Sequence, residues 1–129
     1  MKKILISLTL AAGLFAMNHG ETNDPDLQAA LNGNFEKALI GFEKRCETKK
    51  DGYACGTAGY ILFNGLGGIT KDKEKALELY KKGCEYNDAD SCTLLGYNMY
   101  EKDKKESKKL IEKGCKLGNK DACKFLSKF

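Results

Sequence analysis

A phrase built around two cysteines occurs three times in this chain. It reads KGCEYNDADSC at residues 82–92 and KGCKLGNKDAC at 113–123, with a looser copy, KRCETKKDGYAC, at 44–55. The first cysteines of the copies are 38 and then 31 residues apart. This period is the size of one αα-hairpin, so the phrase predicts a repeat protein built from pairs of helices.

Each copy combines a helix end with a helix start. An Asp or Asn lies four residues before every second cysteine, at Asp51, Asp88 and Asn119. These residues are preferred N-caps because their side-chain oxygens accept a hydrogen bond from a backbone N–H that would otherwise have no partner. The first cysteine of each copy ends a run of apolar residues at helical spacing. Each cysteine pair is therefore expected to join one helix end to the next helix start.

Six cysteines are present, and none forms a Cys-x-x-Cys motif. In an oxidising compartment an even number favours disulfides. Zinc is the alternative, but structural zinc sites bring cysteines two to four residues apart. Here seven or eight residues separate the members of a pair, and the only histidine is His19. We predict disulfides, with neither a metal nor another cofactor, for the pairs Cys46–Cys55, Cys84–Cys92 and Cys115–Cys123.

The N-terminus has the pattern of a secretory signal, because Lys2 and Lys3 precede a largely apolar stretch at residues 4–15. That stretch is shorter than the about 20 residues of a membrane-spanning helix, so no transmembrane segment is expected. We predict a signal peptide at residues 1–16, with cleavage after Gly20 as the alternative. Residues 17–129 would then form one periplasmic or secreted domain of about three helix pairs.

The charge balance gives little reason to expect nucleic acid as a partner. Without Lys2 and Lys3 the formal net charge falls from +4 to +2. The lysines of EKDKKESKKLIEKGCK, residues 101–116, alternate with acidic residues. Such interleaving is typical of a solvated helix surface, and the alternative is a patch that binds an anionic ligand.

The segment AGYILFNGLGGITKDKEKALELYKKGC, residues 58–84, resembles the Sel-like repeat pattern Leu-Gly-x-x-Tyr-x-x-Gly-x-Gly-Val-x-x-Asp-x-x-Lys-Ala. The residues that match its Gly, Val, Asp, Lys and Ala positions are Gly59, Gly65, Gly67, Ile69, Asp72, Lys75 and Ala76. Ala58 replaces the leucine, one glycine is added at Gly68, and the last connector, EKDKKE, lacks Gly-x-Gly. The hairpin turn at that last connector is therefore expected to be shorter.

Over residues 24–129 the chain also resembles the Helicobacter cysteine-rich proteins, which carry a signal peptide and a cysteine pair in every repeat. The resemblance implies an all-α, right-handed superhelix of stacked antiparallel helix pairs, with a cysteine pair bridging neighbouring helices. Members of that family are described as penicillin-binding proteins or β-lactamases. The broader, tetratricopeptide-like repeat class is described as adaptors that hold proteins or peptides.

The residues supply neither known β-lactamase chemistry. A serine enzyme uses Ser-x-x-Lys, in which the amine assists removal of the serine proton. Leucine stands three residues after Ser91 and Ser107, Ser127 lies too near the end, and there is no Lys-Thr-Gly. A metallo-enzyme needs several histidine ligands, and only His19 is present. The sequence therefore assigns no catalytic residue, and β-lactamase or penicillin-binding activity stays the alternative function.

We predict a monomeric binding or scaffold module for a protein, a peptide or a cell-wall fragment such as peptidoglycan, with a β-lactam as the alternative ligand. In the repeat class, the helices that open each repeat line the concave side. Residues three or four apart on such a helix share a face. The candidate binding face is Thr57, Ile61, Asn64, Leu94, Asn98 and Glu101. The alternative is that these are ordinary surface positions.

Overall fold

The computed structural model describes residues 23–129, and in this range the chain forms helices joined by short connectors. The expected signal peptide at 1–16, both cleavage sites and His19 lie outside the described residues. Within the described range, no helix is both long enough and apolar enough to cross a membrane.

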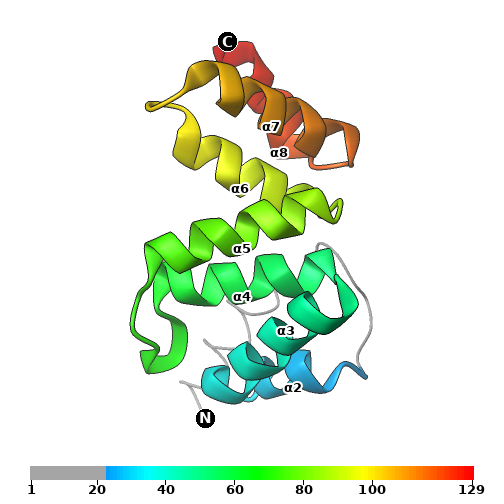
Figure 1. Cartoon of the computed structure of the whole chain (residues 1–129), viewed down its shortest axis with the longest axis vertical. Helices are drawn as coiled ribbons and strands as arrows, with labels where there is room; N and C mark the ends of the chain where they lie inside the picture. The colour runs from blue at the N-terminus through cyan, green and yellow to red at the C-terminus, as the bar shows by residue number, and fades with distance from the viewer. Residues whose placement is uncertain (1–22) are drawn as a thin grey trace.

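The helices stack along the long axis of the molecule, in chain order from one end to the other (Figure 1). They pack mainly against their neighbours in the chain, with α4 against α5 and α6 against α7 as the two most extensive hairpins. The all-α solenoid expected from the repeats is therefore confirmed. The elements are α2 (Pro25–Leu31), α3 (Phe35–Lys49), α4 (Gly52–Asn64), η1 (Leu66–Gly68), α5 (Lys73–Glu85), α6 (Ala89–Met99), α7 (Lys104–Lys116), α8 (Lys120–Phe125) and η2 (Leu126–Lys128).

The helix starts coincide with the N-caps expected from the cysteine phrase. Asp51, Asp88 and Asn119 each accept a hydrogen bond from the backbone N–H three residues on, at 3.2, 3.0 and 2.8 Å. Asp24 caps α2 in the same way, with Pro25 as the first helical residue. These caps place every second cysteine in the first turn of a helix.

Three disulfides connect successive helices. They join α3 to α4 through Cys46 and Cys55, α5 to α6 through Cys84 and Cys92, and α7 to α8 through Cys115 and Cys123. The first two disulfides are buried, whereas Cys123 is exposed.

Glycines in the middle of α4 and α6 let the helices of each hairpin approach closely. A Cβ built on Gly59 would lie 2.8 Å from the Tyr80 ring of α5. A Cβ built on Gly96 would lie 2.7 Å from Cδ1 of Ile111 in α7. A glycine in a helix interior lowers the stability of that helix by up to about 1 kcal/mol relative to alanine. Close packing across the hairpin offsets that loss.

The two sides of the stack differ in how closely the repeats approach one another. On one side α4 contacts α6 directly, whereas α5 and α7, on the other side, make little contact with each other. In the repeat class the helices that open each repeat line the concave side, and here those helices, α4 and α6, form the more closely packed side. We call this the concave side and the side formed by α5 and α7 the convex side.

Candidate functional site

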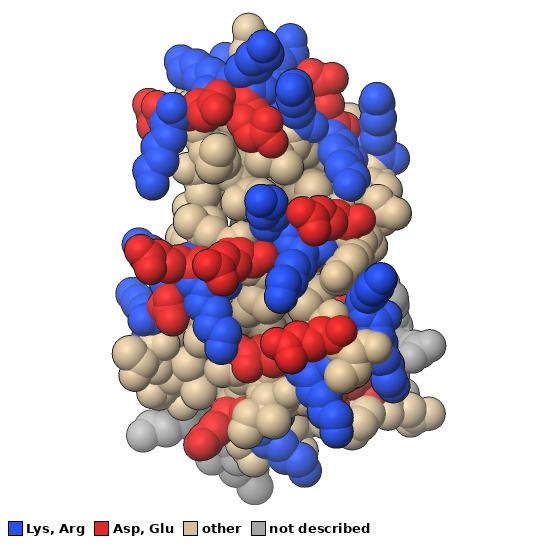
Figure 2. All heavy atoms as spheres, in the orientation of Figure 1, with Lys and Arg blue, Asp and Glu red and all other residues tan. Residues whose placement is uncertain are grey.

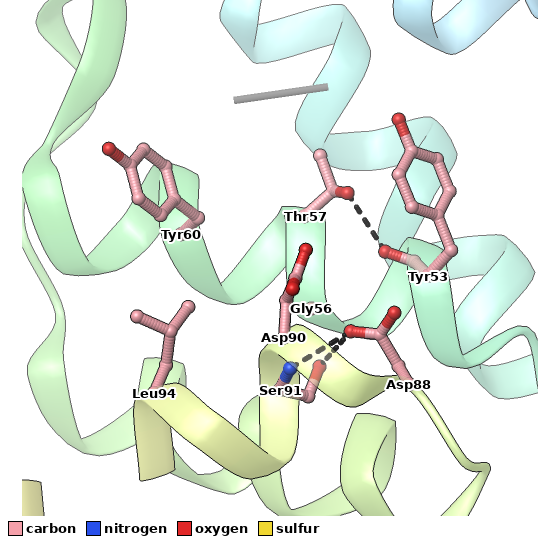
Figure 3. Close-up of a pocket in the computed structure, with 8 residues that line it drawn as sticks. All are labelled: Tyr53, Gly56, Thr57, Tyr60, Asp88, Asp90, Ser91 and Leu94. Carbon is pink, nitrogen blue, oxygen red and sulfur yellow. Dashed lines mark hydrogen bonds between the residues drawn. The ribbon is translucent and has the colours of Figure 1, made fainter. Parts of the chain in front are cut away.

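A small hollow lies where α4 and α6 meet on the concave side (Figure 3). Its volume of about 20 Å³ is close to that of a single bound water, so it matches the tip of a side chain rather than a whole small molecule. Both aromatic and acidic residues surround it. The residues that line it are Tyr53, Gly56, Thr57, Tyr60, Asp88, Asp90, Ser91 and Leu94.

The floor of the hollow depends on a glycine contact. A Cβ on Gly56 would come within 3 Å of both Ser91 Oγ and Asp88 Oδ2, so only glycine permits this approach of α4 to α6. Ser91 donates to Asp88 Oδ2 twice, from its hydroxyl at 2.6 Å and from its backbone N–H at 3.0 Å. The carboxylate that caps α6 is thereby held at the wall of the hollow (Figure 3).

The opposite wall is formed by the first turns of α4. The Thr57 hydroxyl donates to the Tyr53 carbonyl at 2.8 Å (Figure 3). The Tyr53 ring packs edge-on against Phe42, with the ring centroids 6.0 Å apart. Burial raises the pKa of Tyr53 to about 12, so its hydroxyl stays protonated at neutral pH and this wall is uncharged.

Asp90 connects the hollow to the C-terminal helix. Its Oδ1 accepts a hydrogen bond from Nδ2 of Asn119, the N-cap of α8, at 2.7 Å. Asn119 is buried, at 8% exposure. The contact therefore aligns the start of α8 with the start of α6.

The structure brings only two of the six residues of the predicted binding face to this hollow, Thr57 and Leu94. The Asn98 amide donates to the Leu94 carbonyl at 2.8 Å, and the Asn64 amide to the Tyr60 carbonyl at 3.0 Å. Both amides are thus engaged with their own helix. Glu101 is exposed, but it lies beyond the end of α6.

Ile61 does not belong to a binding face. Its side chain is fully buried, at 0% exposure, and is part of the hydrophobic core. The physical reason is that α4 is the central helix of the stack, with α3, α5 and α6 packed around it. Thr57 is itself buried, at 6% exposure, so Asn64 is the only one of the three predicted α4 positions that is exposed.

Sequence reasoning missed several residues of the hollow. Asp88 is identified from the sequence only as an N-cap, and Asp90 and Ser91 are not singled out. The available signal was the DADSC stretch, in which the acidic N-cap Asp88 is followed two residues later by a second acidic residue, Asp90. Tyr53 and Tyr60 gave no comparable signal, because a tyrosine at helical spacing usually belongs to the hydrophobic core.

The described residues do not present a metal site or a serine–lysine pair. Within residues 23–129 no group of three or more His, Cys, Asp and Glu could hold a metal ion. Each serine hydroxyl in this range donates to a nearby oxygen: Ser91 to Asp88, Ser107 to the Gly96 carbonyl and Ser127 to the Lys124 carbonyl. These contacts hold each hydroxyl against its own helix or the neighbouring one.

Comparison with known proteins agrees with this architecture. A family model described as Sel1 repeat matches residues 53–88 and 84–119. The structure is similar to Helicobacter pylori cysteine rich protein B, with 30% sequence identity, a TM-score of 0.68 and coverage of 97% of this chain and 96% of the other. It shares its fold with a Sel1 repeat protein from Oxalobacter formigenes, at 21% identity and a TM-score of 0.61, covering 97% of this chain and 48% of the other. No match was found among curated proteins.

Proposed function

This chain belongs to the Sel1 repeat family, and from that premise we propose that it is a binding module that holds a protein or peptide segment on its concave side. We further propose that it works in the periplasm or outside the cell. The three disulfides of the described helices support this location, because disulfides persist in nonreducing compartments.

The observation that carries the proposal is the hollow between α4 and α6. It is large enough for the tip of one side chain, and it lies where two repeats meet on the concave side. Solenoid proteins commonly use such concave surfaces to bind extended partners. The tip of one side chain of a bound segment would enter the hollow, while the rest of the segment follows the half-buried positions of α6 and the exposed end of α4 at Asn64.

The lining favours a basic side chain. Tyr60 and Leu94 provide an apolar border, and Asp88 and Asp90 provide carboxylates. Lysine and arginine carry an aliphatic stem that suits apolar borders and a cationic tip that suits carboxylates. We therefore propose a partner segment that presents at least one lysine or arginine.

Affinity capture from a cell-envelope extract tests this proposal, with the folded, oxidised protein as bait. Leu94→Lys places a cation at the border of the hollow. Leu117→Lys is the matched control, because Leu117 is an exposed leucine on a connector away from the hollow. We expect Leu94→Lys to lose partners that both the unmodified protein and the control retain, with all three proteins melting at the same temperature. Equal retention by both variants would contradict the concave site.

Synthetic peptides then test the preference for a basic residue. A captured segment with its lysine or arginine replaced by glutamine should bind more weakly, by about tenfold for the loss of a charge-assisted contact. Unchanged binding would leave the concave site in place but exclude the acidic hollow as its anchor. The described residues provide no observation that favours the alternative, β-lactamase activity, over binding.

A further inference from the structure

The concave side continues past the hollow to the next repeat junction, between α6 and α8. Two residues after the second cysteine of each pair lie Thr57, Leu94 and Phe125. Five residues after it, in the first two repeats, lie Tyr60 and Tyr97. Thr57, Tyr60 and Leu94 line the hollow. By repeat equivalence, Tyr97 and Phe125 therefore hold the corresponding positions one repeat further along the concave side.

Aromatic rings fill this second junction, at the position where the first junction has its hollow. The rings of Tyr97 and Phe125 pack edge-on, with their centroids 4.8 Å apart. Tyr100 and Phe129 extend the group, because the Tyr100 ring centroid lies 5.3 Å from that of Phe125 and 5.4 Å from that of Phe129. We call these four residues the aromatic cluster.

The aromatic cluster is only partly covered by the protein. Phe129 is 40% exposed, and the other three rings are half-buried. By contrast, the ring pair at the other end of the stack is covered, since Phe42 is 0% and Tyr53 is 7% exposed. Aromatic rings attract a further ring in offset or edge-on contact. The cluster therefore presents an apolar surface on which a partner's ring can pack.

Leu94 connects the hollow to the aromatic cluster. It lies at the same end of the hollow as Tyr60, away from Asp88 (Figure 3). Tyr97 follows Leu94 by three residues on α6, so the two side chains share a helical face. An apolar path thus leads from the hollow to the cluster.

The charges around the two features differ. Two carboxylates line the hollow, with no lysine or arginine among its described lining residues. Around the cluster the charges are mixed: Lys104 Nζ lies 5.0 Å from the Tyr100 ring centroid, whereas burial and the negative charge of Asp121 raise the pKa of Tyr97. Figure 2 likewise shows acidic side chains among the lysines at the end of the molecule that carries α7. The hollow therefore selects by charge and the cluster by apolar contact.

We propose that the partner segment carries an aromatic residue three positions from its lysine or arginine, and that this aromatic residue packs on the aromatic cluster. The proposal rests on the binding function proposed above. Packed helices lie about 8 to 10 Å apart, so one repeat separates the hollow from the cluster by about that distance. A polyproline II chain advances about 9.3 Å in three residues and returns to the same face. A segment in this conformation presents its basic side chain to the hollow and its ring to the cluster at once.

The test uses a synthetic peptide as the probe, because the partner is unidentified. The peptide is Ser-Lys-Pro-Pro-Phe-Pro-Ser, whose prolines favour the polyproline II conformation. The reversed order, Ser-Phe-Pro-Pro-Lys-Pro-Ser, is measured beside it, because the geometry determines the spacing and not the chain direction. Affinity is measured by NMR titration of the ¹⁵N-labelled, full-length, oxidised protein.

Control peptides separate the two anchors and their spacing. One replaces phenylalanine by alanine, one replaces lysine by glutamine, and two move phenylalanine to the second or fourth position from lysine. We expect each control to bind at least about threefold more weakly than the better of the two parent peptides. The parent peptide should shift the amide signals of Leu94, Tyr97 and Phe125.

A pair of protein variants identifies the ring contact. Phe129→Ala removes the most exposed ring of the cluster. Leu117→Ala is the matched control, because Leu117 is 39% exposed and belongs to the connector between α7 and α8. We expect Phe129→Ala to weaken the phenylalanine peptide by at least about threefold and to leave the alanine peptide unchanged, since only paired rings are coupled. Leu117→Ala should change neither affinity, and melting curves should show all three proteins folded.

Failure of this inference is distinguishable from failure of the proposed function. If the phenylalanine and alanine peptides bind equally while glutamine still weakens binding, the hollow remains a site and the ring contact is refuted. Equal binding at spacings of two, three and four refutes the register. Equal binding of the lysine and glutamine peptides refutes the basic anchor of the proposed function, and with it the paired motif.

Two further results would overturn the proposal. Shifted signals at Leu77, Leu95 and Leu110, which line a groove of about 650 Å³ between α5 and α7, would assign the peptide to the convex side. Shifts of Phe129 that depend on protein concentration without peptide, together with dimers in sedimentation, would make a second copy of the chain the occupant of the cluster.

Discussion

Arg45 binds Asp24 across 21 residues of sequence, with Nη1 of the guanidinium 2.7 Å from Oδ2 of the carboxylate. The same guanidinium also contacts Asp26 at 3.2 Å and Asp51 at 2.8 Å. Asp24 and Asp51 are the N-caps of α2 and α4. One arginine near the end of α3 therefore ties together the starts of the helices on both sides of it.

Replacing Arg45 should destabilise the N-terminal end of the stack. Arg45→Gln leaves three partly buried carboxylates without their shared cation, and we expect the free energy of unfolding to fall by about 1 to 3 kcal/mol. Urea unfolding of the oxidised protein at pH 7 measures the change. Lys44→Gln, at an exposed position one residue away, is the control and should cost less than about 0.5 kcal/mol. Equal losses would show that the arginine network adds no stability.

The same network predicts how stability depends on pH. Burial raises the pKa of Asp24, but hydrogen bonds from Arg45 and from the backbone N–H groups of Leu27 and Asp26 outweigh it, so the net pKa is lowered. A carboxyl whose pKa is lower in the folded state stabilises the protein above its unfolded pKa, and this stability is lost as pH falls through the folded value. Melting temperatures should therefore drop on acidification below about pH 4. The drop should be smaller in Arg45→Gln, and an identical pH profile would contradict the assignment.

The close approach of α6 to α7 predicts a coupled pair of substitutions. Gly96→Ala raises helix propensity but places a methyl group 2.7 Å from Ile111 Cδ1, so we expect a net loss of about 1 to 3 kcal/mol. Ile111→Ala removes that Cδ1 and also Cγ1, which would lie 2.8 Å from the same methyl group. In its background, Gly96→Ala should cost at least about 0.5 kcal/mol less, as measured by a double-mutant cycle in urea. Additive effects would mean that the two side chains do not compete for space.

The disulfides should differ in importance and in accessibility. Peptide mapping without reduction should identify Cys46–Cys55, Cys84–Cys92 and Cys115–Cys123, and a bond between repeats would refute this pairing. Replacing Cys84 and Cys92 by alanine should lower the unfolding midpoint more than replacing Cys115 and Cys123, because the former pair is buried between two hairpins and the latter holds only the terminal α8. A mild dithiol should reduce the Cys115–Cys123 bond first, since Cys123 is exposed.

Hydrolysis of β-lactams should be absent from the purified, oxidised protein. The serine hydroxyls of residues 23–129 all donate to structural oxygens, so no activated serine is available there. We expect a chromogenic β-lactam to be hydrolysed no faster than by a variant with all cysteines replaced. Saturable turnover that disappears on replacing one polar residue, such as Asn98 or Glu101, would make the protein an enzyme and contradict the binding function.

Much of the fold could be predicted because its signals are local. A cap hydrogen bond spans three residues, so Asp51, Asp88 and Asn119 identify helix starts without knowledge of any distant contact. The shorter last connector was also predictable: four residues separate α6 from α7, whereas eight separate α4 from α5. Gly59 and Gly96 indicated close packing, because glycine destabilises a helix interior and its lack of a side chain allows a neighbouring helix to approach.

The candidate site was less predictable, because residue spacing indicates which side chains share a face but not what covers that face. The prediction for Ile61 was wrong since three other helices surround α4. Arg45 gave no signal in the sequence, because its partners Asp24 and Asp26 come from a different helix. Lys81 and Glu106 have the opposite charges to Glu43 and Lys75 at the equivalent repeat positions. This difference could be recognised only after the structure showed that Glu43 and Lys75 form an ion pair.

The sequence by itself determined the repeat period, the helix starts at the cysteine phrases and the family, since each depends on caps, apolar spacing and motifs within about 40 residues of chain. The tertiary structure alone decided which surfaces stay open. Leu94 lines the hollow between α4 and α6, and the adjacent Leu95 lines the groove between α5 and α7. Their exposure depends on the distances between α4 and α6 and between α5 and α7, and those distances are set by side chains of several helices packing at once.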